Sequence, residues 1–223
     1  MDRPLTLRAH DVRAIIDGRK TQHRDVLPQP SFEAQGCSDA ALGGKSLWFD
    51  YWSSEHRGTN SIKLPCAPGD KFWVREAWAV RGVYSDVTEI GYKASERESH
   101  SEYVEQIRND KIGGTGLKVT WPNYRQANHM PRWASRITLL VTDVRVQRVQ
   151  DISEEDAIAE GAPKLVFIPD SGTFHEHSNG TFKCGYMGYF SYRHGPDAWD
   201  RNDWVVARTF EVLKSNIGEV KHG

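Results

Sequence analysis

The sequence predicts an α+β fold in which short strands curl around a small core and a few short helices pack against them. Three observations favour this class. Apolar and polar residues alternate in several stretches of the 223-residue chain. Fewer segments have the apolar period of a helix, and no linker separates two apolar regions. We therefore expect one domain, residues 1–223, built on a small curled sheet or barrel, with irregular insertions near residues 29–67 and 164–198.

The first elements are predicted to be a strand, a helix and a second extended segment. Residues 5–9 alternate in polarity, which indicates a strand. Apolar residues between Val12 and Ile16 share one face of a helix. Gly18 follows where a left-handed helix stop favours glycine, and residues 20–26 then predict a strand.

The middle of the chain predicts two strands and a charged segment. Residues 68–70 have turn chemistry and lead into an apolar strand over residues 71–80. Residues 89–94 predict another short strand. The charged residues 95–116 predict a helix or a disordered arm, followed by a flexible glycine loop.

The last third contains the clearest strand and the clearest helix start. Residues 136–149 form a β-branched apolar series with one break in phase, which we interpret as a bulge at residues 142–143. Ser153 begins a helix in the manner of a capping box, with acidic residues in the first turn. Gly161 ends that helix, and residues 203–213 predict a closing strand.

Composition excludes a generally basic nucleic-acid-coating protein. Lys and Arg total 29 against 30 Asp and Glu, so the formal net charge is -1. A local basic cleft stays compatible with this balance. Eight Trp, eight Tyr and eight Phe are a heavy aromatic load, which suits both a core and a pocket that stacks a flat ring.

The cysteines and histidines favour a reducing compartment and no metal. Cys37, Cys66 and Cys184 are far apart and odd in number, unlike a disulfide framework. No apolar run approaches the roughly 20 residues of a membrane helix, and the N-terminal stretch lacks the apolar core of a signal peptide. We expect a cytoplasmic protein without membrane contact. His175 and His177 lack a third ligand at a recognisable spacing, so we expect no metal.

Four motifs resemble one family. They are GRKT after the first helix, PGDKFWVREAW, HMPRWASRITLLVTDVRVQRVQDISEEDAIAEGA, and AWDRNDWVV. Together they cover about half of the chain and resemble, in order, the ASCH domain, a branch of the PUA-like barrels. The similarity is greatest to the larger phage and prophage members. It implies a small PUA-like β-barrel with short helices packed at its openings and a cleft for a nucleotide-sized ligand.

The resemblance also implies a reaction and its residues. Characterised small ASCH proteins are amidohydrolases that remove acyl groups from N4-acylated cytosine nucleosides, above all N4-acetylcytidine. Their catalytic lysine and glutamate correspond to Lys20 and Glu160, and their catalytic threonine to His23. His23 departs from the pattern, and Thr21 is the alternative source of a hydroxyl. A second departure is the segment before AWDRNDWVV, where FKCGYMGYFSYRHGPDAW replaces the usual helix.

The residue types suit amide hydrolysis without a metal or other cofactor. Glu160 can act as base to a water molecule and return the proton to the departing amine. Lys20 can stabilise the developing oxyanion, and His23 can act as a proton relay. Each also has a simpler interpretation, as a solvated lysine, an exposed helix residue or a structural histidine.

A second group of side chains is expected to bind the substrate. Trp133 offers a stacking surface, although a large aromatic residue more often packs in a core. Ser135 and Arg136 offer polar contacts. Arg75 and Glu76 either face the cleft or form an ion pair on the barrel. The predicted substrate-binding residues are Thr21, Arg24, Arg75, Glu76, Trp133, Ser135 and Arg136.

Two alternative functions stay open. PUA-like barrels commonly bind RNA or a modified base without changing it, and basic residues could line such a cleft; the balanced net charge argues against this. A ribonuclease that uses His23 and Lys20 as acid and base has some family precedent. The expected partners are therefore a small modified pyrimidine nucleoside and, in the alternatives, RNA.

Overall fold

The computed structural model describes most of the chain and divides it into two compact units. The described residues are 2–29, 36–38, 46–52, 57–95, 104–112, 117–168 and 172–220, with the backbone alone for those between 36 and 63. Unit 1 comprises Met1–Gly18, Asp70–Leu140 and Glu211–Gly223, and unit 2 comprises Arg19–Gly69 and Val141–Phe210. Each unit is assembled from segments that are distant in the sequence. The expected single domain stays a prediction.

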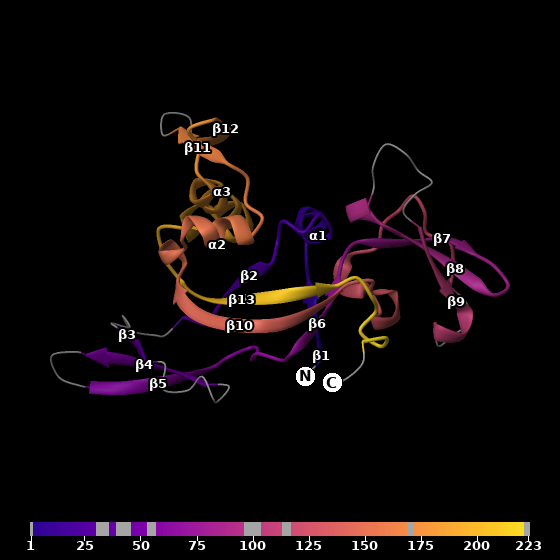
Figure 1. Cartoon of the computed structure of the whole chain (residues 1–223), viewed down its shortest axis with the longest axis horizontal. Helices are drawn as coiled ribbons and strands as arrows, with labels where there is room; N and C mark the ends of the chain where they lie inside the picture. Colours follow the sequence, from indigo (N-terminus) through magenta and orange to yellow (C-terminus); the bar gives the residue numbers. More distant parts are fainter. Residues whose placement is uncertain are drawn as a thin grey trace. The chain divides into compact units, whose positions relative to one another are not determined.

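Unit 1 combines a parallel strand pair with an antiparallel meander. Its elements are β1 (Asp2–Thr6), α1 (Ala9–Ile16), β6 (Lys71–Arg75), β7 (Trp78–Val83), β8 (Val87–Tyr92), β9 (Val104–Arg108) and the 3-10 turns η1 (Lys93–Ser95), η2 (Asn109–Lys111), η3 (Ala127–His129) and η4 (Arg132–Ala134). Strand β1 runs parallel to β6, and β7, β8 and β9 pair in sequence order (Figure 1). Trp78, Val80, Ile90, Tyr92 and Met130 form a buried core.

Unit 2 contains the other two α-helices. Its elements are β2 (Gln22–Val26), β3 (Gly36–Ser38), β4 (Ser46–Trp52), β5 (Arg57–Lys63), η5 (Val149–Asp151), α2 (Glu154–Ala159), β11 (Leu165–Ile168), β12 (Thr173–Glu176), α3 (Phe182–His194) and η6 (Pro196–Ala198). Helices α2 and α3 lie together with the β11–β12 hairpin (Figure 1). Val149, Ile152, Tyr186, Phe190 and Val205 form the core beneath them.

Two long strands pass through both units along the chain. They are β10 (Thr138–Arg148) and β13 (Trp204–Leu213). In unit 1 the start of β10 pairs antiparallel with β6, and in unit 2 the first part of β13 pairs antiparallel with β2. The hydrogen-bonded order of this five-stranded sheet is β1-β6-β10-β13-β2.

Several local predictions are confirmed. Gly18 follows α1 with φ of 73°, and Gly161 follows α2 with φ of 76°, the left-handed conformation that favours glycine. The Ser153 hydroxyl accepts a hydrogen bond from the Asp156 amide at 3.1 Å, so Ser153 is the N-cap of α2. In β10 the alternation of burial breaks where residues 142–143 are both exposed, and the bulge at these residues stays a prediction.

The coarse class is α+β as predicted, but both insertions were wrongly interpreted as irregular. Across the described residues the sheets are open, and none closes into a barrel. Residues 29–67 contain the antiparallel sheet β3-β4-β5. Residues 164–198 contain the β11–β12 hairpin and the 13-residue helix α3. The aromatic segment before AWDRNDWVV is therefore itself a helix.

The physical reasons for α3 are visible at its start and on its buried face. The Thr181 hydroxyl accepts a hydrogen bond from the Cys184 amide at 3.0 Å and caps the helix. Tyr186 and Phe190, one turn apart, are both buried. Tertiary burial thus outweighs the low helix propensity of the glycines.

The charged segment after β8 is also different from the prediction. Residues 104–108 form strand β9, which pairs antiparallel with β8 rather than forming a helix. After β9 the 3-10 turn η2 follows at Asn109–Lys111. Residues 96–103 and 113–116 of the same predicted segment lie outside the described residues. None of the helices that the structure describes is long and apolar enough to cross a membrane.

Candidate functional site

The turn after α1 and the end of α2 supply a Lys–Glu pair within unit 2. The Lys20 ammonium donates to Oε2 of Glu160 at 2.6 Å and to the Glu160 main-chain oxygen at 2.9 Å. The Thr21 amide donates to the Ala159 carbonyl at 2.8 Å, which fixes the turn against α2. The Lys20 side chain is 0% exposed and that of Glu160 is 2% exposed. The two predicted catalytic side chains are therefore in direct contact, and their roles stay predictions.

Arg24 connects the same carboxylate to a second one. Its Nη1 donates to Oε1 of Glu160 at 2.9 Å, and its Nη2 donates to Oδ2 of Asp156 at 2.6 Å. Asp156 and Glu160 are one helical turn apart, so the planar guanidinium can reach both. Arg24 was predicted to bind substrate, yet in the structure it is buried and holds Glu160. Each Glu160 oxygen thus has its own cationic donor.

Asp156 is the second carboxylate of this cluster. Burial alone would raise the pKa of Asp156, but hydrogen bonding to Arg145 and the charge of Arg24 lower it below its ordinary value. Gln22 also donates to Asp156, at 3.3 Å. The two buried cations Lys20 and Arg24 therefore face two carboxylates, which is how buried charges are tolerated, and the half-exposed Arg145 adds a third cation beside Asp156.

Tyr186 of α3 borders this cluster. The Cζ atom of Arg24 lies 5.9 Å from the centroid of the Tyr186 ring. Burial, and then the negative charge of Glu160, raise the pKa of Tyr186 well above its ordinary value, so its phenol stays protonated at neutral pH. Sequence reasoning missed Tyr186 because its segment was not interpreted as a helix.

Asp156 and Gln22 were also missed, although the sequence contains a signal for each. Asp156 precedes Glu160 by four residues on the predicted helix, which places both carboxylates on one face. Gln22 and Arg24 alternate on the predicted strand, so their side chains share one face of β2.

His23 belongs to another cluster. It lies between Gln22 and Arg24 on β2, so its side chain leaves from the opposite face of the strand. Its Nε2 is 3.2 Å from Oδ1 of Asp25, whose other oxygen accepts from Arg208 at 2.6 Å. The structure therefore pairs His23 with Asp25, whereas Glu160 is paired with Lys20 and Arg24. Thr21, the alternative hydroxyl, is exposed.

Basic side chains around Asp25 lower the pKa of its carboxyl group. Burial would raise the pKa of this carboxyl, but His23, Arg208 and Arg193 together hold it well below its usual range. Nε2 of His23 is therefore beside a carboxylate that stays ionised at neutral pH.

Arg75 and Glu76, predicted either to face the cleft or to form an ion pair, each bond to other residues of unit 1. Arg75 donates to the Thr6 hydroxyl and to the Asn128 carbonyl, both at 3.1 Å. Glu76 instead accepts two hydrogen bonds from Arg136, at 2.9 and 3.1 Å. Burial raises the pKa of Glu76, and Arg136 offsets part of that effect.

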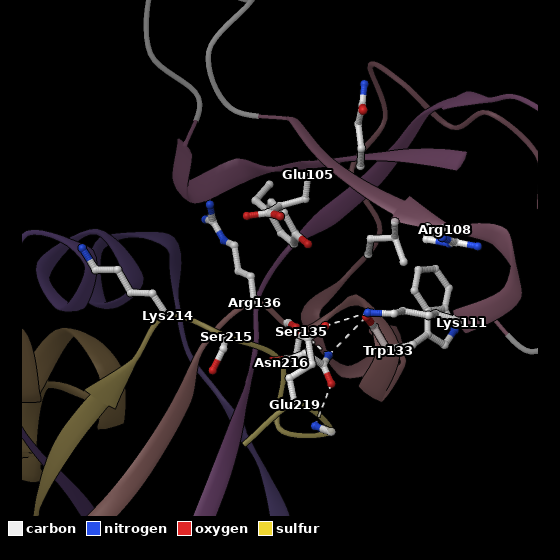
Figure 2. A pocket seen from close by; sticks show the side chains of 14 residues that line it. Glu105, Arg108, Lys111, Trp133, Ser135, Arg136, Lys214, Ser215, Asn216 and Glu219 are labelled. Atoms are coloured by element: carbon white, nitrogen blue, oxygen red, sulfur yellow. Dashed lines mark hydrogen bonds and ion pairs between the residues drawn. The ribbon is translucent and has the colours of Figure 1, made fainter. Parts of the chain in front are cut away.

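The other predicted binding residues line a pocket of unit 1. Trp133, Ser135 and Arg136 border a hollow of about 680 Å³ (Figure 2). The Ser135 hydroxyl donates to the Val74 carbonyl at 2.9 Å, so this side chain connects the backbone of the pocket to strand β6. The ring of Trp133 meets that of Trp78 edge-on, with centroids 5.9 Å apart.

The predicted site residues thus lie in both units. In unit 2, Lys20, Arg24 and Glu160 share one cluster and His23 belongs to another. In unit 1, Trp133, Ser135 and Arg136 line the pocket.

Comparison of the chain with models of protein families, with curated proteins and with solved structures found no match. The resemblance to the ASCH domain therefore depends on the four sequence motifs alone. The chemistry of the candidate site is inferred from the contacts of its own residues.

Proposed function

We propose that the protein is an amidohydrolase that removes the acyl group from an N4-acylated cytosine nucleoside, with Lys20 and Glu160 as catalytic residues. The observation that carries the proposal is the 2.6 Å contact between the Lys20 ammonium and the Glu160 carboxylate. Two motifs 140 residues apart supply these groups. They are the motifs whose counterparts hold the catalytic lysine and glutamate of the resembling family.

The two groups provide what amide hydrolysis requires. Glu160 takes a proton from water, and the resulting hydroxide adds to the acyl carbon. Lys20 stabilises the negative charge that develops on the acyl oxygen. The bond between carbon and N4 then breaks, and the protonated Glu160 returns its proton to the departing amine. The products are a carboxylic acid and the cytosine nucleoside, and this scheme needs no metal or cofactor.

Burial of the pair sets a requirement for this reaction. Since the Lys20 side chain is fully buried, unit 2 must open locally before a substrate reaches it. Tyr186 borders the cluster, so α3 is the element whose displacement we expect. An opening of this kind is common where binding energy of the substrate assembles an active site.

The remaining parts of the proposal come from the sequence. The membership of the ASCH family is supported by the four motifs. A cytoplasmic location is supported by the cysteine pattern of the sequence. The proposed partner is a small modified pyrimidine nucleoside.

The test is to incubate the purified full chain with N4-acetylcytidine and to measure cytidine and acetate by chromatography. We expect steady release of cytidine, and a panel with longer N4-acyl groups would define the preferred size. Failure of the wild-type chain to cleave any N4-acylcytosine nucleoside would refute the proposal.

A matched pair of lysine variants separates the site from general effects of charge. Lys20→Met should remove turnover, because it deletes the cation that faces the oxyanion. Lys164→Met deletes an exposed lysine of the same unit and should leave turnover unchanged. Equal activity of the two variants, with both chains folded by circular dichroism, would contradict the assignment of Lys20.

A further inference from the structure

Helix α2 is bonded to the first turn of α3 by one carboxylate. The Glu154 side chain accepts hydrogen bonds from the main-chain amides of Phe182 and Lys183, through Oε1 at 2.7 Å and Oε2 at 2.9 Å. The first amides of a helix have no acceptor within it, and the helix dipole favours a negative charge at this end. Glu154 therefore supplies acceptors for two amides that α3 itself leaves without one.

Two further contacts strengthen this junction between the helices. The Lys183 ammonium donates to the Gln150 carbonyl at 2.7 Å, in the turn η5 that precedes α2. At Gly185 an added Cβ would lie 1.8 Å from the Pro163 carbonyl oxygen, so the backbone of α3 approaches the segment after α2 closely. The N-terminal half of α3 is thus held against α2 and the segments that flank it.

Tyr186 connects the junction to the contact between Lys20 and Glu160. It lies one helical turn after Phe182, on the same face of α3, and it is buried. The centroid of its ring is 5.9 Å from Cζ of Arg24, whose Nη1 donates to Glu160 at 2.9 Å. A movement of the first two turns of α3 away from α2 therefore moves Tyr186 away from the cluster.

The chain immediately before α3 is held by separate bonds. The main chains of Leu165 and Thr181 exchange two hydrogen bonds, at 3.1 and 2.9 Å, which attach the start of the helix to strand β11. Glu154 takes no part in these bonds. Loss of the Glu154 contacts can therefore release the first turns of α3 while residue 181 stays attached to β11.

We propose that Glu154 is the latch that keeps α3 closed over the contact between Lys20 and Glu160. Because both side chains of that contact are buried, the closed arrangement excludes a substrate, and release of the latch gives access to them. Glu154 acts through α3 and is not itself a catalytic residue. The closure of α3 does not depend on the reaction, whereas its effect on turnover rests on the proposed amidohydrolase function.

Hydrogen exchange of the purified full chain tests the latch with Glu154→Gln, which removes the charge and one acceptor oxygen. The amides of residues 185–190 should exchange about tenfold faster than in the wild type, because α3 opens more often, while those of β10 and β13 keep their rates. The matched control Glu155→Gln removes an exposed carboxylate from the same first turn of α2 and should exchange like the wild type. Equal exchange of α3 in the two variants, or faster exchange throughout unit 2 in Glu154→Gln, would overturn the proposal.

Acetylation of Lys20 measures the opening without a substrate. Its side chain is 0% exposed, so acetic anhydride should reach the amine only when α3 opens. Mass spectrometry should show Lys20 acetylated about tenfold faster in Glu154→Gln than in the wild type or Glu155→Gln. The exposed Lys118 of unit 1 is the internal reference and should react equally in all three chains. Equal labelling of Lys20 in the three chains would reject α3 as the cover of the contact.

Steady-state kinetics with N4-acetylcytidine test the consequence for the proposed reaction. A ligand that binds only the open form has its apparent affinity reduced by the open fraction, so Glu154→Gln should lower KM about tenfold with little change in kcat. Glu155→Gln should keep both values, and a merely structural defect would lower kcat instead. An unchanged KM in Glu154→Gln would show that the latch does not control the entry of substrate. If the wild type shows no turnover, the proposed function fails, while exchange and labelling still decide for or against the latch.

Discussion

Arg24 is the residue whose contacts give the candidate site its shape. It joins Oε1 of Glu160 to Asp156 while Lys20 holds Oε2 of Glu160. The carboxylate of Glu160 is thereby fixed in one orientation, as a positioned general base requires. Arg24 contacts Glu160 and is therefore a positioning residue in the proposed reaction.

The change Arg24→Met tests how much the buried cluster depends on this side chain. It leaves Glu160 and Asp156 with fewer cationic donors, and we expect the free energy of unfolding to fall by about 3–5 kcal/mol, as for other broken buried pairs. Urea denaturation measures this quantity. The control Arg145→Met removes another donor to Asp156, but one that is 45% exposed, so it should cost about 0–1 kcal/mol. Equal losses for the two variants would contradict this account of Arg24.

Asp25 should make the stability of the protein dependent on pH. Its pKa is below the usual range in the folded chain, so its ionised form stabilises the fold above the pKa of the unfolded chain, roughly 4. That contribution is lost as pH falls below this value. Asp25→Asn should therefore be less stable than the wild type at pH 7, with a gap that narrows from about pH 4 downwards.

Urea midpoints of the wild type and of Asp25→Asn at pH 7, 4 and 3 would check this prediction. The midpoints should converge as the pH falls. A gap that stays constant, or widens toward pH 3, would show that the Asp25 charge is not what stabilises the cluster.

At the residue scale, the sequence identified the charged pair but not its surroundings. Lys20 and Glu160 were found because they lie in recognisable motifs. The sequence predicted that Arg24 binds the substrate and that His23 takes part in catalysis. In the structure their side chains leave opposite faces of β2, so Arg24 contacts Glu160 and His23 contacts Asp25. Successive side chains of a strand point to opposite faces, so the predicted strand at residues 22–25 already places Arg24 and His23 on different faces.

Helix α3 shows what element-scale reasoning can miss. The N-cap and glycine stop of α2 are local signals, and they were interpreted correctly. In α3 the aromatic, glycine and histidine residues give no clear stripe in the sequence, and the helix is stabilised by burying Tyr186 and Phe190 against the core of unit 2. Such tertiary burial has no local signature.

Gly185 provides a test of how closely α3 packs. A Cβ atom at this position would lie 1.8 Å from the Pro163 carbonyl oxygen, whereas one at Gly188 would lie 3.0 Å from the Phe174 ring. A ring can move aside more easily than backbone. Gly185→Ala should therefore lower the free energy of unfolding by about 1–3 kcal/mol, as overpacking does, despite a gain of about 1 kcal/mol in helix propensity.

Gly188→Ala is the matched control, because it adds the same propensity in the same helix. We expect it to be more stable than Gly185→Ala in thermal or urea unfolding. If both changes stabilise the protein equally, the packing of α3 against Pro163 is looser than the structure indicates.

At the scale of the whole molecule, the alternation of apolar and polar residues predicted the α+β class but not which strands pair with each other. Alternation identifies which face of β1, β10 or β13 is buried, but not which distant strand lies beside it. The parallel pairing of β1 with β6, separated by more than 60 residues of chain, depends on the complete fold. The division into two units, each with a core of its own, likewise has no signal in composition.

The central claim is that the buried contact between Lys20 and Glu160 performs chemistry and does more than stabilise unit 2. The double change Lys20→Met and Glu160→Gln separates these roles, because it removes both charges together and leaves an amide oxygen at position 160 as an acceptor for Arg24. A neutral replacement of a buried pair is often tolerated by the fold.

The most direct measurement is the rate at which the folded double variant releases cytidine from N4-acetylcytidine, compared with the wild type. We predict a chain that unfolds cooperatively like the wild type but whose rate is at least about 1,000-fold lower, since a general base and an oxyanion partner are both lost. A folded double variant that hydrolyses N4-acetylcytidine at the wild-type rate would contradict the claim.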